Sequence, residues 1–310
     1  MRCLVTGGAG FIGSHLVDAL VTQGDEVIVV DSLITGRKKH LFSHITQKKV
    51  TLIEKDLIHE EWMQACNGVD RIYHLAADPD VRASAEHPKR QLQNTIIATH
   101  QVLEAMRQYQ IPELVFTSTS TVYGEATVIP TPETYTPMEP VSVYGASKLA
   151  CEALISAYCH SFEIQSWIYR FANIVGERSN HGVIYDFIAK LRKNPCELEI
   201  LGDGKQAKSY LSVSACVQAM LFGAEHAKKQ VNYLNIGSDD WIDVTTIAEI
   251  VALEMGLSSV PFRYTGGDRG WVGDVPKMQL SCDAMKALGW KPSINSYESV
   301  VQAVRAALPV

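Results

Sequence analysis

The chain has 310 residues, of which 46% are hydrophobic and 20% are charged. This composition is typical of a folded globular protein and excludes a disordered chain. Its 34 acidic side chains outnumber its 28 basic ones, so the formal net charge is −6 and no basic surplus favours nucleic acid or an anionic membrane. The length fits one large α/β domain or a domain with an added lobe.

No apolar run approaches the roughly 18 residues that a membrane span needs. The start of the chain, MRCLVTGGAGFIG, is not typical of a signal peptide, because its short apolar stretch leads into glycines. The seven cysteines are scattered without a CxxC pair, and the ten histidines show no metal-binding spacing. We therefore expect a cytoplasmic protein with no metal, no nucleic-acid partner and no membrane contact.

Strand and helix patterns alternate through the first half of the chain. The expected strands are Arg2–Thr6, Glu26–Val30, Val50–Ile53, Arg71–Leu75, Leu114–Thr117 and Gln165–Tyr169. The clearest expected helices are Gly10–Gln23, Leu92–Gln110 and Tyr144–Phe162. This alternation of buried strands with helices predicts an α/β fold of the Rossmann type, a doubly wound parallel sheet covered on both faces.

The alternation breaks after about residue 176. Short strands, helices and the glycine-rich turns GDG (202–204) and TGGDRGWVGD (265–274) follow. We therefore expect a dinucleotide-binding domain over residues 1–176 and a smaller α/β lobe made mainly of residues 177–310, although the chain can cross back between them. Ligands of open α/β sheets bind at the carboxyl ends of the strands, where such a lobe would lie.

A glycine-rich turn follows the first expected strand and opens the first expected helix. Within TGGAGFIG, Gly7 allows a tight turn, Gly10 allows the backbone to approach a pyrophosphate, and Gly13 allows close packing of helix on strand. Asp31 lies 31 − 13 = 18 residues later, at the end of the second strand, where a carboxylate accepts hydrogen bonds from a ribose diol. The carboxylate would repel a 2′-phosphate, which favours NAD over NADP. Three nearby cations leave NADP as a minority alternative: Arg37, Lys38 and Lys39.

The spacing of these glycines resembles that of the extended short-chain dehydrogenase/reductase family. Further matching segments follow in the same order, namely Asp56-Leu57, HLAA (74–77), FTSTSTVYG (116–124), YGASK (144–148), YRFAN (169–173) and LGDG (201–204). Within that family the chain is most similar to nucleotide-sugar epimerases of the UDP-glucose 4-epimerase type. The resemblance implies NAD-binding roles for Gly7, Gly10, Phe11, Ile12, Gly13, Asp31, Ser32, Asp56, Leu57, Leu75, Ala76, Ala77, Asn94, Ser118, Tyr144, Lys148 and Phe171.

Tyr144 and Lys148 are four residues apart on an expected helix and so share one face. A free phenol, with a pKa near ~10, is a poor base at neutral pH. A neighbouring ammonium, with the positive charge of an oxidised nicotinamide, favours phenolate. Lowering the phenol pKa by ~3 units needs ~4 kcal/mol, which two close cations can supply in a partly dry site.

Thr119 follows the Leu114–Thr117 strand and aligns with the catalytic Ser/Thr of the resembled family, so its hydroxyl is expected to relay a proton from the sugar. Dehydratases of that family carry an Asp-Glu pair after this residue, whereas this chain has Ser120 and Thr121. Members that epimerise C3 or C5 carry a cysteine where Thr121 stands. The resemblance therefore implies reversible hydride transfer through a transient ketosugar, with Tyr144 as base, and we expect the protein to be an isomerase.

The resemblance also implies a binding site for a UDP-sugar. Its expected residues are Arg82, Thr119, Tyr144, Asn173, Val183, Glu199, Leu201, Lys208, Arg269, Asp274 and Met278. Lys208 stands where the family's phosphate-binding Arg is usual, and Trp271 replaces another usual Arg, so Arg269 must reach from a different offset. In the resembled family, a Tyr at the position of Met278 excludes N-acetyl groups, and a small residue at that position admits them. We therefore expect UDP-glucose, UDP-galactose and UDP-N-acetylglucosamine to be accepted with unequal efficiency.

Other activities remain open: a 2-epimerase, a uronic acid 4-epimerase, a decarboxylase or another nucleotide-sugar oxidoreductase, and a non-catalytic NAD-binding regulator. The intact set of Thr119, Tyr144 and Lys148 argues against the regulator. The resemblance further implies a homodimer in which the helices around Leu92–Gln110 and Tyr144–Phe162 form a four-helix bundle. These helices carry apolar residues beyond one sheet-facing stripe, for example Ile96, Leu103, Leu154 and Ala157.

Overall fold

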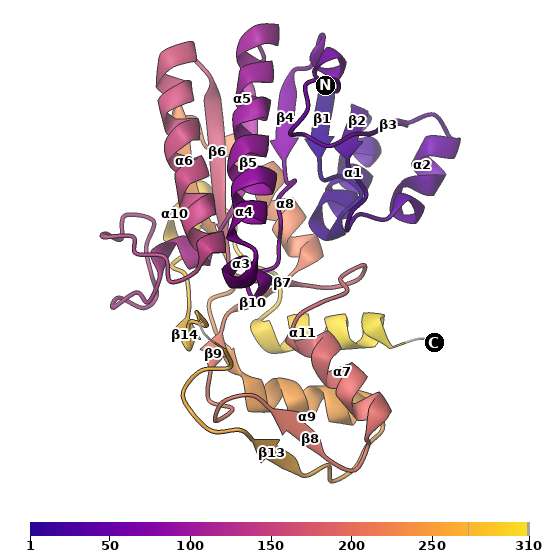
Figure 1. Cartoon of the computed structure of the whole chain (residues 1–310), viewed down its shortest axis with the longest axis vertical. Helices are drawn as coiled ribbons and strands as arrows, with labels where there is room; N and C mark the ends of the chain where they lie inside the picture. Colours follow the sequence, from indigo (N-terminus) through magenta and orange to yellow (C-terminus); the bar gives the residue numbers. More distant parts are fainter. Residues whose placement is uncertain (272, 309–310) are drawn as a thin grey trace. The chain divides into compact units, whose positions relative to one another are not determined.

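The computed structural model describes residues 1–271 and 273–308, which form two compact units that share the chain in several crossings. The first unit contains Met1–Val122, Ser142–Arg170 and Met220–Leu234. The second contains Tyr123–Val141, Phe171–Ala219 and Asn235–Val310. Residues distant in sequence therefore meet within each unit, as the colours of Figure 1 show.

A seven-stranded sheet forms the centre of the first unit, with strand order β11-β6-β5-β4-β1-β2-β3. Its strands are β1 (Arg2–Thr6), β2 (Glu26–Asp31), β3 (Val50–Glu54), β4 (Arg71–His74), β5 (Glu113–Thr119), β6 (Gln165–Phe171) and β11 (Val231–Ile236). The pairings of β1 with β2 and β4, of β2 with β3, and of β4 with β5 are parallel. The predicted Rossmann-type sheet is thus confirmed.

Helices cover this sheet. They are α1 (Phe11–Gln23), η1 (Lys38–Leu41), α2 (Phe42–Thr46), η2 (Met63–Cys66), α3 (Ala83–Glu86), α4 (Pro88–Gln91), η3 (Leu92–Ile97), α5 (Ala98–Tyr109), η4 (Ser120–Tyr123), α6 (Val143–Phe162) and the part of α8 (Val213–His226) from Met220 onward. Figure 1 shows α5 and α6 side by side, and both contribute to a core that includes Leu4, Ile28 and Phe116 of the sheet. The alternating residues Val5 and Val29 are buried as well, so both faces of the sheet are covered.

Local sequence explains where α1 and α6 begin and end. The helix α1 starts directly after the glycine turn and ends at Gly24, whose φ of 87° is the left-handed conformation that glycine adopts most easily. The side chain of Ser142 caps α6 by accepting a hydrogen bond from the Gly145 amide at 3.1 Å. This cap fixes the first turn of α6, which contains Tyr144.

The structure differs from the sequence expectation in two places that matter for the site. The expected helix over 92–110 begins with a π-helical segment, η3, before the regular α5. The strand β5 continues through Thr119, so this residue ends the strand and does not follow it. Continued burial from Leu114 to Thr119 explains the longer strand, since the polar side chains of its last three residues find partners inside the unit.

Small sheets and helices make up the second unit in the part of the chain that the structure describes, and the start of α8, up to Ala219, also belongs to it. Its strands are β7 (Asn173–Val175), β8 (Leu198–Ile200), β9 (Ala207–Lys208), β10 (Tyr210–Ser212), β12 (Ile242–Asp243), β13 (Phe262–Tyr264) and β14 (Lys277–Met278), and its helices are α7 (Val183–Lys193), α9 (Val244–Glu254), α10 (Asp283–Leu288) and α11 (Ser296–Ala307). Apolar faces of α7, α9 and α11 meet around Phe187, Ile247 and Val300. The strands pair as β10-β7, β12-β9-β14 and β13-β8.

Across residues 1–271 and 273–308, none of the helices combines the length and the apolar character that crossing a membrane requires.

Candidate active site

The glycine turn between β1 and α1 passes close to other backbone. At Gly7, where φ is +69°, a Cβ atom would lie 2.8 Å from the amide nitrogen of Ala76. At Gly13 a Cβ atom would lie 2.2 Å from the carbonyl oxygen of Gly7. Only glycine fits both places, so the turn is compact and the first amides of α1 face its outer side. These residues fit a pyrophosphate at the positive end of a helix.

Asp31 at the end of β2 is tied to the same turn. Its Oδ2 accepts a hydrogen bond from the Ala9 amide at 2.9 Å, and its Oδ1 accepts one from the Leu33 amide at 2.8 Å. Burial raises the pKa of Asp31 while these two amides lower it. The carboxylate therefore positions the glycine turn in addition to the ribose contact expected of it, and Ser32 beside it is exposed.

The remaining cofactor residues expected in the first unit lie after the carboxyl ends of its strands, at the start of α1 or on η3. The Thr6 hydroxyl accepts a hydrogen bond from the Ala76 amide at 3.3 Å, and the Thr6 carbonyl accepts one from the Leu75 amide at 3.2 Å. Asp56 accepts from the Ile58 amide in a local turn. The others are the buried Leu57 and Ser118 and the half-buried Phe11, Ile12, Ala77 and Asn94. Phe171 belongs to the second unit, where it is buried.

The three expected catalytic residues meet in the first unit. The Thr119 side chain hydrogen-bonds the Tyr144 phenol. The Lys148 ammonium donates to the Thr117 carbonyl at 2.8 Å and lies 4.7 Å from the centre of the Phe116 ring. The end of β5 and the first two turns of α6 thus hold the phenol, the hydroxyl and the ammonium together.

Burial dominates the electrostatics of this group. It raises the pKa of Tyr144 to about 12, with Thr119 lowering it and the Asp78 carboxylate raising it further. Burial lowers the pKa of Lys148 to about 8, while Cys151 and Glu152 raise it. The sequence analysis expects the pKa of Tyr144 to be lowered by the Lys148 ammonium together with an oxidised nicotinamide. With the protein groups alone, desolvation of the phenolate outweighs the Thr119 hydrogen bond.

Thr119 is oriented by its neighbour. Its Oγ1 accepts a hydrogen bond from the Thr121 amide at 3.2 Å and lies 3.1 Å from the Thr121 hydroxyl. An oxygen held in this way keeps its own proton available for the phenol or for a sugar oxygen. Ser120 is buried and begins η4.

One fully buried ion pair and one between a buried carboxylate and an exposed guanidinium lie near this group and were not anticipated from the sequence. Glu152 pairs with Arg170 at 2.7 Å, and Asp78 pairs with Arg90 at 2.6 Å. The spacing of Tyr144, Lys148 and Glu152 could have placed Glu152 on the same face of α6, since residues four apart share a helix face, but it gives no signal for the partner Arg170. The second pair has no local signal, because a loop supplies Asp78.

In the second unit the structure brings together part of the expected UDP-sugar site. Lys208 donates to Asp274 at 2.6 Å and lies 5.3 Å from the centre of the Trp271 ring. Met278 on β14 lies opposite Lys208 on β9 in a parallel pair. Asp274 is buried and also accepts from the Gly270 amide at 3.0 Å. We call Lys208, Asp274 and Met278 the lysine cluster.

Arg269 lies next to this cluster. Its Nη1 donates to the Asp274 carbonyl at 3.2 Å, and its guanidinium pairs with Glu125 through both terminal nitrogens, at 2.5 and 3.1 Å. A Cβ atom at Gly270 would lie 3.8 Å from the Leu201 Cβ, so Leu201 belongs to the same surroundings. The Lys208 ammonium and the Arg269 guanidinium are therefore each already paired with a carboxylate.

The other expected substrate residues are more dispersed. Asn173 on β7 donates from its side chain to the Ser209 carbonyl at 3.3 Å, next to Lys208 in sequence. The Glu199 carboxylate pairs with Arg263, and its carbonyl accepts from Lys190 at 3.2 Å. Val183 begins α7 and is half-buried. Arg82 is exposed on a loop of the first unit.

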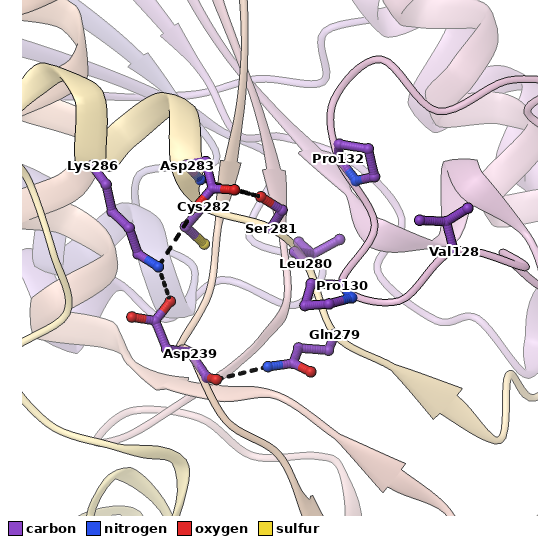
Figure 2. Close-up of a pocket in the computed structure, with 10 residues that line it drawn as sticks. All are labelled: Val128, Pro130, Pro132, Asp239, Gln279, Leu280, Ser281, Cys282, Asp283 and Lys286. Carbon is purple, nitrogen blue, oxygen red and sulfur yellow. Dashed lines mark hydrogen bonds and ion pairs between the residues drawn. The ribbon is translucent and has the colours of Figure 1, made fainter.

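A polar cavity of about 490 Å³ lies elsewhere in the second unit (Figure 2). Lys286 and Asp239 form an ion pair at 2.6 Å on its wall, and Ser281 donates to Asp283 at 2.8 Å. Its other lining residues are Val128, Pro130, Pro132, Gln279, Leu280 and Cys282. None of the expected site residues lines it, although Gln279 follows Met278 in sequence.

Comparisons with known proteins agree with this arrangement. The model of the NAD dependent epimerase/dehydratase family matches residues 3–237. A putative UDP-glucose 4-epimerase from Methanocaldococcus jannaschii is 34% identical over 308 residues, 97% of this chain and 96% of that protein. A crystal structure of a UDP-galactose 4-epimerase is 43% identical with a TM-score of 0.88, covering 99% of this chain and 98% of that one.

Relatives with other printed activities are also similar. A UDP-glucuronic acid 4-epimerase from Bacillus cereus, solved with UDP-glucuronic acid and NAD, is 26% identical with a TM-score of 0.87, covering 99% of this chain and 98% of that one. UDP-glucuronic acid decarboxylase 1 of Arabidopsis thaliana is 31% identical over 98% of this chain and 69% of its own length.

Proposed function

The chain belongs to the NAD dependent epimerase/dehydratase family, and we propose that it is an isomerase that inverts C4 of a UDP-hexose through a transient ketosugar. The observation that carries the proposal is the group of Thr119, Tyr144 and Lys148 at the carboxyl end of β5. Similar proteins named as UDP-glucose and UDP-galactose 4-epimerases support the sugar position.

The glycine turn and Asp31 would hold NAD, which would supply a reversible hydride acceptor for the sugar carbon. The phenolate of Tyr144 removes the hydroxyl proton, directly or through the Thr119 hydroxyl, and gives it back when the ketone is reduced. The Lys148 ammonium supports the phenolate electrostatically. Because burial and the Asp78 carboxylate raise the phenol pKa to about 12 despite the Thr119 hydrogen bond, formation of the phenolate requires positive charge nearby.

The residues at positions 120 and 121 argue against dehydration and against epimerisation at C3 or C5, the other reactions considered for this family. Elimination of water needs an acid and a base after Thr119, and epimerisation at C3 or C5 needs a second proton carrier there. Ser120 and Thr121 supply neither, because their hydroxyls do not ionise near neutral pH. Thr121 instead orients Thr119.

We assign the UDP moiety to the lysine cluster together with Arg269. A diphosphate needs cations and backbone donors, and Lys208 and Arg269 lie around the same Asp274. For a diphosphate to bind, the carboxylates of Asp274 and Glu125 must release these two cations or share them with the diphosphate. Lys208 acts as a point charge without the two-pronged geometry of an Arg.

We further propose a homodimer built on α5, α6 and η3 in a reducing cytoplasm. Leu92, Ile97 and Phe162 of these helices are between 39% and 48% exposed, although they are large and apolar. Leu103, which the sequence analysis counted among the spare apolar residues, is instead fully buried in the core of the first unit, because it faces the sheet. Ala157 is exposed, and Ile96 and Leu154 are partly buried.

The deciding experiment incubates the purified protein, without added NAD, with a panel of UDP-hexoses, UDP-N-acetylhexosamines and UDP-uronic acids, and follows anomeric protons by NMR. We expect interconversion of UDP-glucose and UDP-galactose. Tyr144→Phe should lower kcat by at least about a hundredfold. Tyr158→Phe, on the same helix and hydrogen-bonded to Glu104, should not.

The panel also separates the alternatives. Release of CO2 from UDP-glucuronic acid indicates a decarboxylase, inversion of that sugar a uronic acid 4-epimerase, and inversion at C2 a 2-epimerase. Binding of NAD without turnover of any sugar indicates a regulator. Any of these results in place of the glucose–galactose exchange refutes the proposed reaction.

A further inference from the structure

Glu152 lies on the same face of α6 as two residues to which the proposed function assigns chemistry. Tyr144, Lys148 and Glu152 follow one another at intervals of four residues, about 6 Å along the helix axis. The Glu152 side chain is 2% exposed and that of its partner Arg170 is 3% exposed. Together with the buried Lys148, they place three ionised groups inside one unit.

The Glu152 carboxylate uses both oxygens. Its Oε2 accepts from Arg170 Nη2 at 2.7 Å, and its Oε1 accepts from Arg170 Nε at 3.1 Å and from the Ser118 hydroxyl at 2.5 Å. A buried ion pair adds little net stability over apolar side chains of similar volume, because desolvation of both ions offsets their attraction. Stability alone therefore does not explain this arrangement.

Ser118 connects the carboxylate to the catalytic group. Three successive residues at the end of β5 each hold a different side chain of α6: the Thr117 carbonyl holds Lys148, the Ser118 hydroxyl holds Glu152, and the Thr119 hydroxyl holds Tyr144. The contacts to Lys148 and to Glu152 each involve an ionised group and are charge-assisted, whereas the contact to Tyr144 joins two hydroxyl groups. The contact to Glu152 fixes the strand end between the other two contacts.

We propose that Glu152 is a positioning residue for the epimerase reaction. Its carboxylate holds the end of β5 against α6 through Ser118, and its charge keeps the neighbouring Lys148 ammonium protonated. The proposal rests on the proposed function for the roles of Tyr144 and Lys148, but the geometry of Glu152 is independent of the substrate.

The charged and titratable groups around Lys148 and Glu152 come from four elements. They are Tyr144 and Cys151 on α6, His74 on β4, Arg170 on β6 and Tyr233 on β11. Arg170 is cationic, and its guanidinium lies 4.9 Å from the centre of the Tyr233 ring. Removing the Glu152 charge takes away an anion near Lys148 and leaves the Arg170 cation uncompensated. Each of these two effects disfavours a proton on Lys148.

The test compares Glu152→Gln with a matched control, Glu113→Gln. Glu113 pairs with Arg71 at 2.6 Å and lies at the opposite end of β5, so its substitution removes a partly buried ion pair far from the catalytic group. Both variants are measured as NAD-loaded protein for kcat, KM and the pH profile of kcat. The Lys148 ¹³Cε shift is titrated in lysine-labelled protein, with the signal assigned by its loss in Lys148→Arg.

For Glu152→Gln we expect kcat to fall by about 10- to 100-fold with KM changed less than about threefold, since the reacting groups and not the sugar site are displaced. The alkaline limb of the kcat profile and the Lys148 titration should both move to lower pH, by about one unit. Glu113→Gln should lower the unfolding midpoint and leave kcat and both titrations unchanged.

Equal changes in the two variants, or an unchanged Lys148 titration in Glu152→Gln, overturn the proposal. If Glu152→Gln does not fold, Ser118→Ala decides it: kcat should fall at constant KM, and an unchanged kcat contradicts the positioning role. If the wild type converts no UDP-sugar, the proposed function fails, while the Lys148 titration still decides the role of Glu152.

Discussion

The buried His74 makes a specific prediction about stability at acidic pH. The Thr99 hydroxyl donates to the Thr95 carbonyl at 2.7 Å, so it can only accept from His74 Nε2 at 2.9 Å. Burial keeps the imidazole neutral, so with the proton on Nε2 the other ring nitrogen, Nδ1, accepts from the Thr6 hydroxyl at 2.7 Å. A second proton on Nδ1 would force the Thr6 hydroxyl to turn from donor to acceptor and would place a charge in a fully buried site.

Burial, with a smaller contribution from the Lys148 charge, lowers the pKa of His74 to about 3. In the unfolded chain the imidazole has a pKa near ~6.5, so between these values the unfolded state binds more protons. The free energy of unfolding should therefore fall as pH drops below ~6.5, by ~1.4 kcal/mol per unit, which amounts to ~2 kcal/mol at pH 5.

The assay is urea unfolding of the wild type and of His74→Gln at pH 7.5 and pH 5.0. Gln keeps a donor toward Thr99 but does not titrate, so the loss of stability between the two pH values should be ~2 kcal/mol smaller than in the wild type. His226→Gln, an exposed histidine on α8, is the control and should behave as the wild type. Equal losses in wild type and His74→Gln would refute the tautomer and the burial argument.

Three further predictions concern the cofactor, the assembly and the substrate. Denatured protein should release NAD, because a complete turnover regenerates it; an absence of released dinucleotide with a strict need for NADP contradicts the interpretation of Asp31. Light scattering at micromolar concentration should give a dimer, and a monodisperse monomer counts against the exposed apolar residues of η3 and α6. Met278→Tyr should lower activity on UDP-N-acetylglucosamine by more than about tenfold and on UDP-glucose by less than about threefold, because a fixed ring fills the volume of the acetyl group; equal losses contradict a gate at Met278.

Local patterns were sufficient for the parallel sheet, the glycine turn and the placement of Tyr144 and Lys148 on one helix. Each depends on residues that are close in sequence: alternation of apolar strands and helices, a glycine motif next to a strand, and a four-residue spacing on one helix. Asp31 was predictable for the same reason, because the length of a βαβ unit places it near the turn. The extension of β5 to Thr119 was not predictable, because it depends on partners that the last strand residues find elsewhere in the fold.

Tertiary structure decided how the charges are paired. Glu152 meets Arg170 only because β6 folds back beside β5, and Lys208 meets Asp274, 66 residues later, only because β9 and β14 pair. It also decided that Leu103 faces the core while Phe162 stays exposed, since an apolar residue on a helix does not show by itself what covers it. Ion pairs and burial depend on which distant segments pack together, and no local periodicity contains that information.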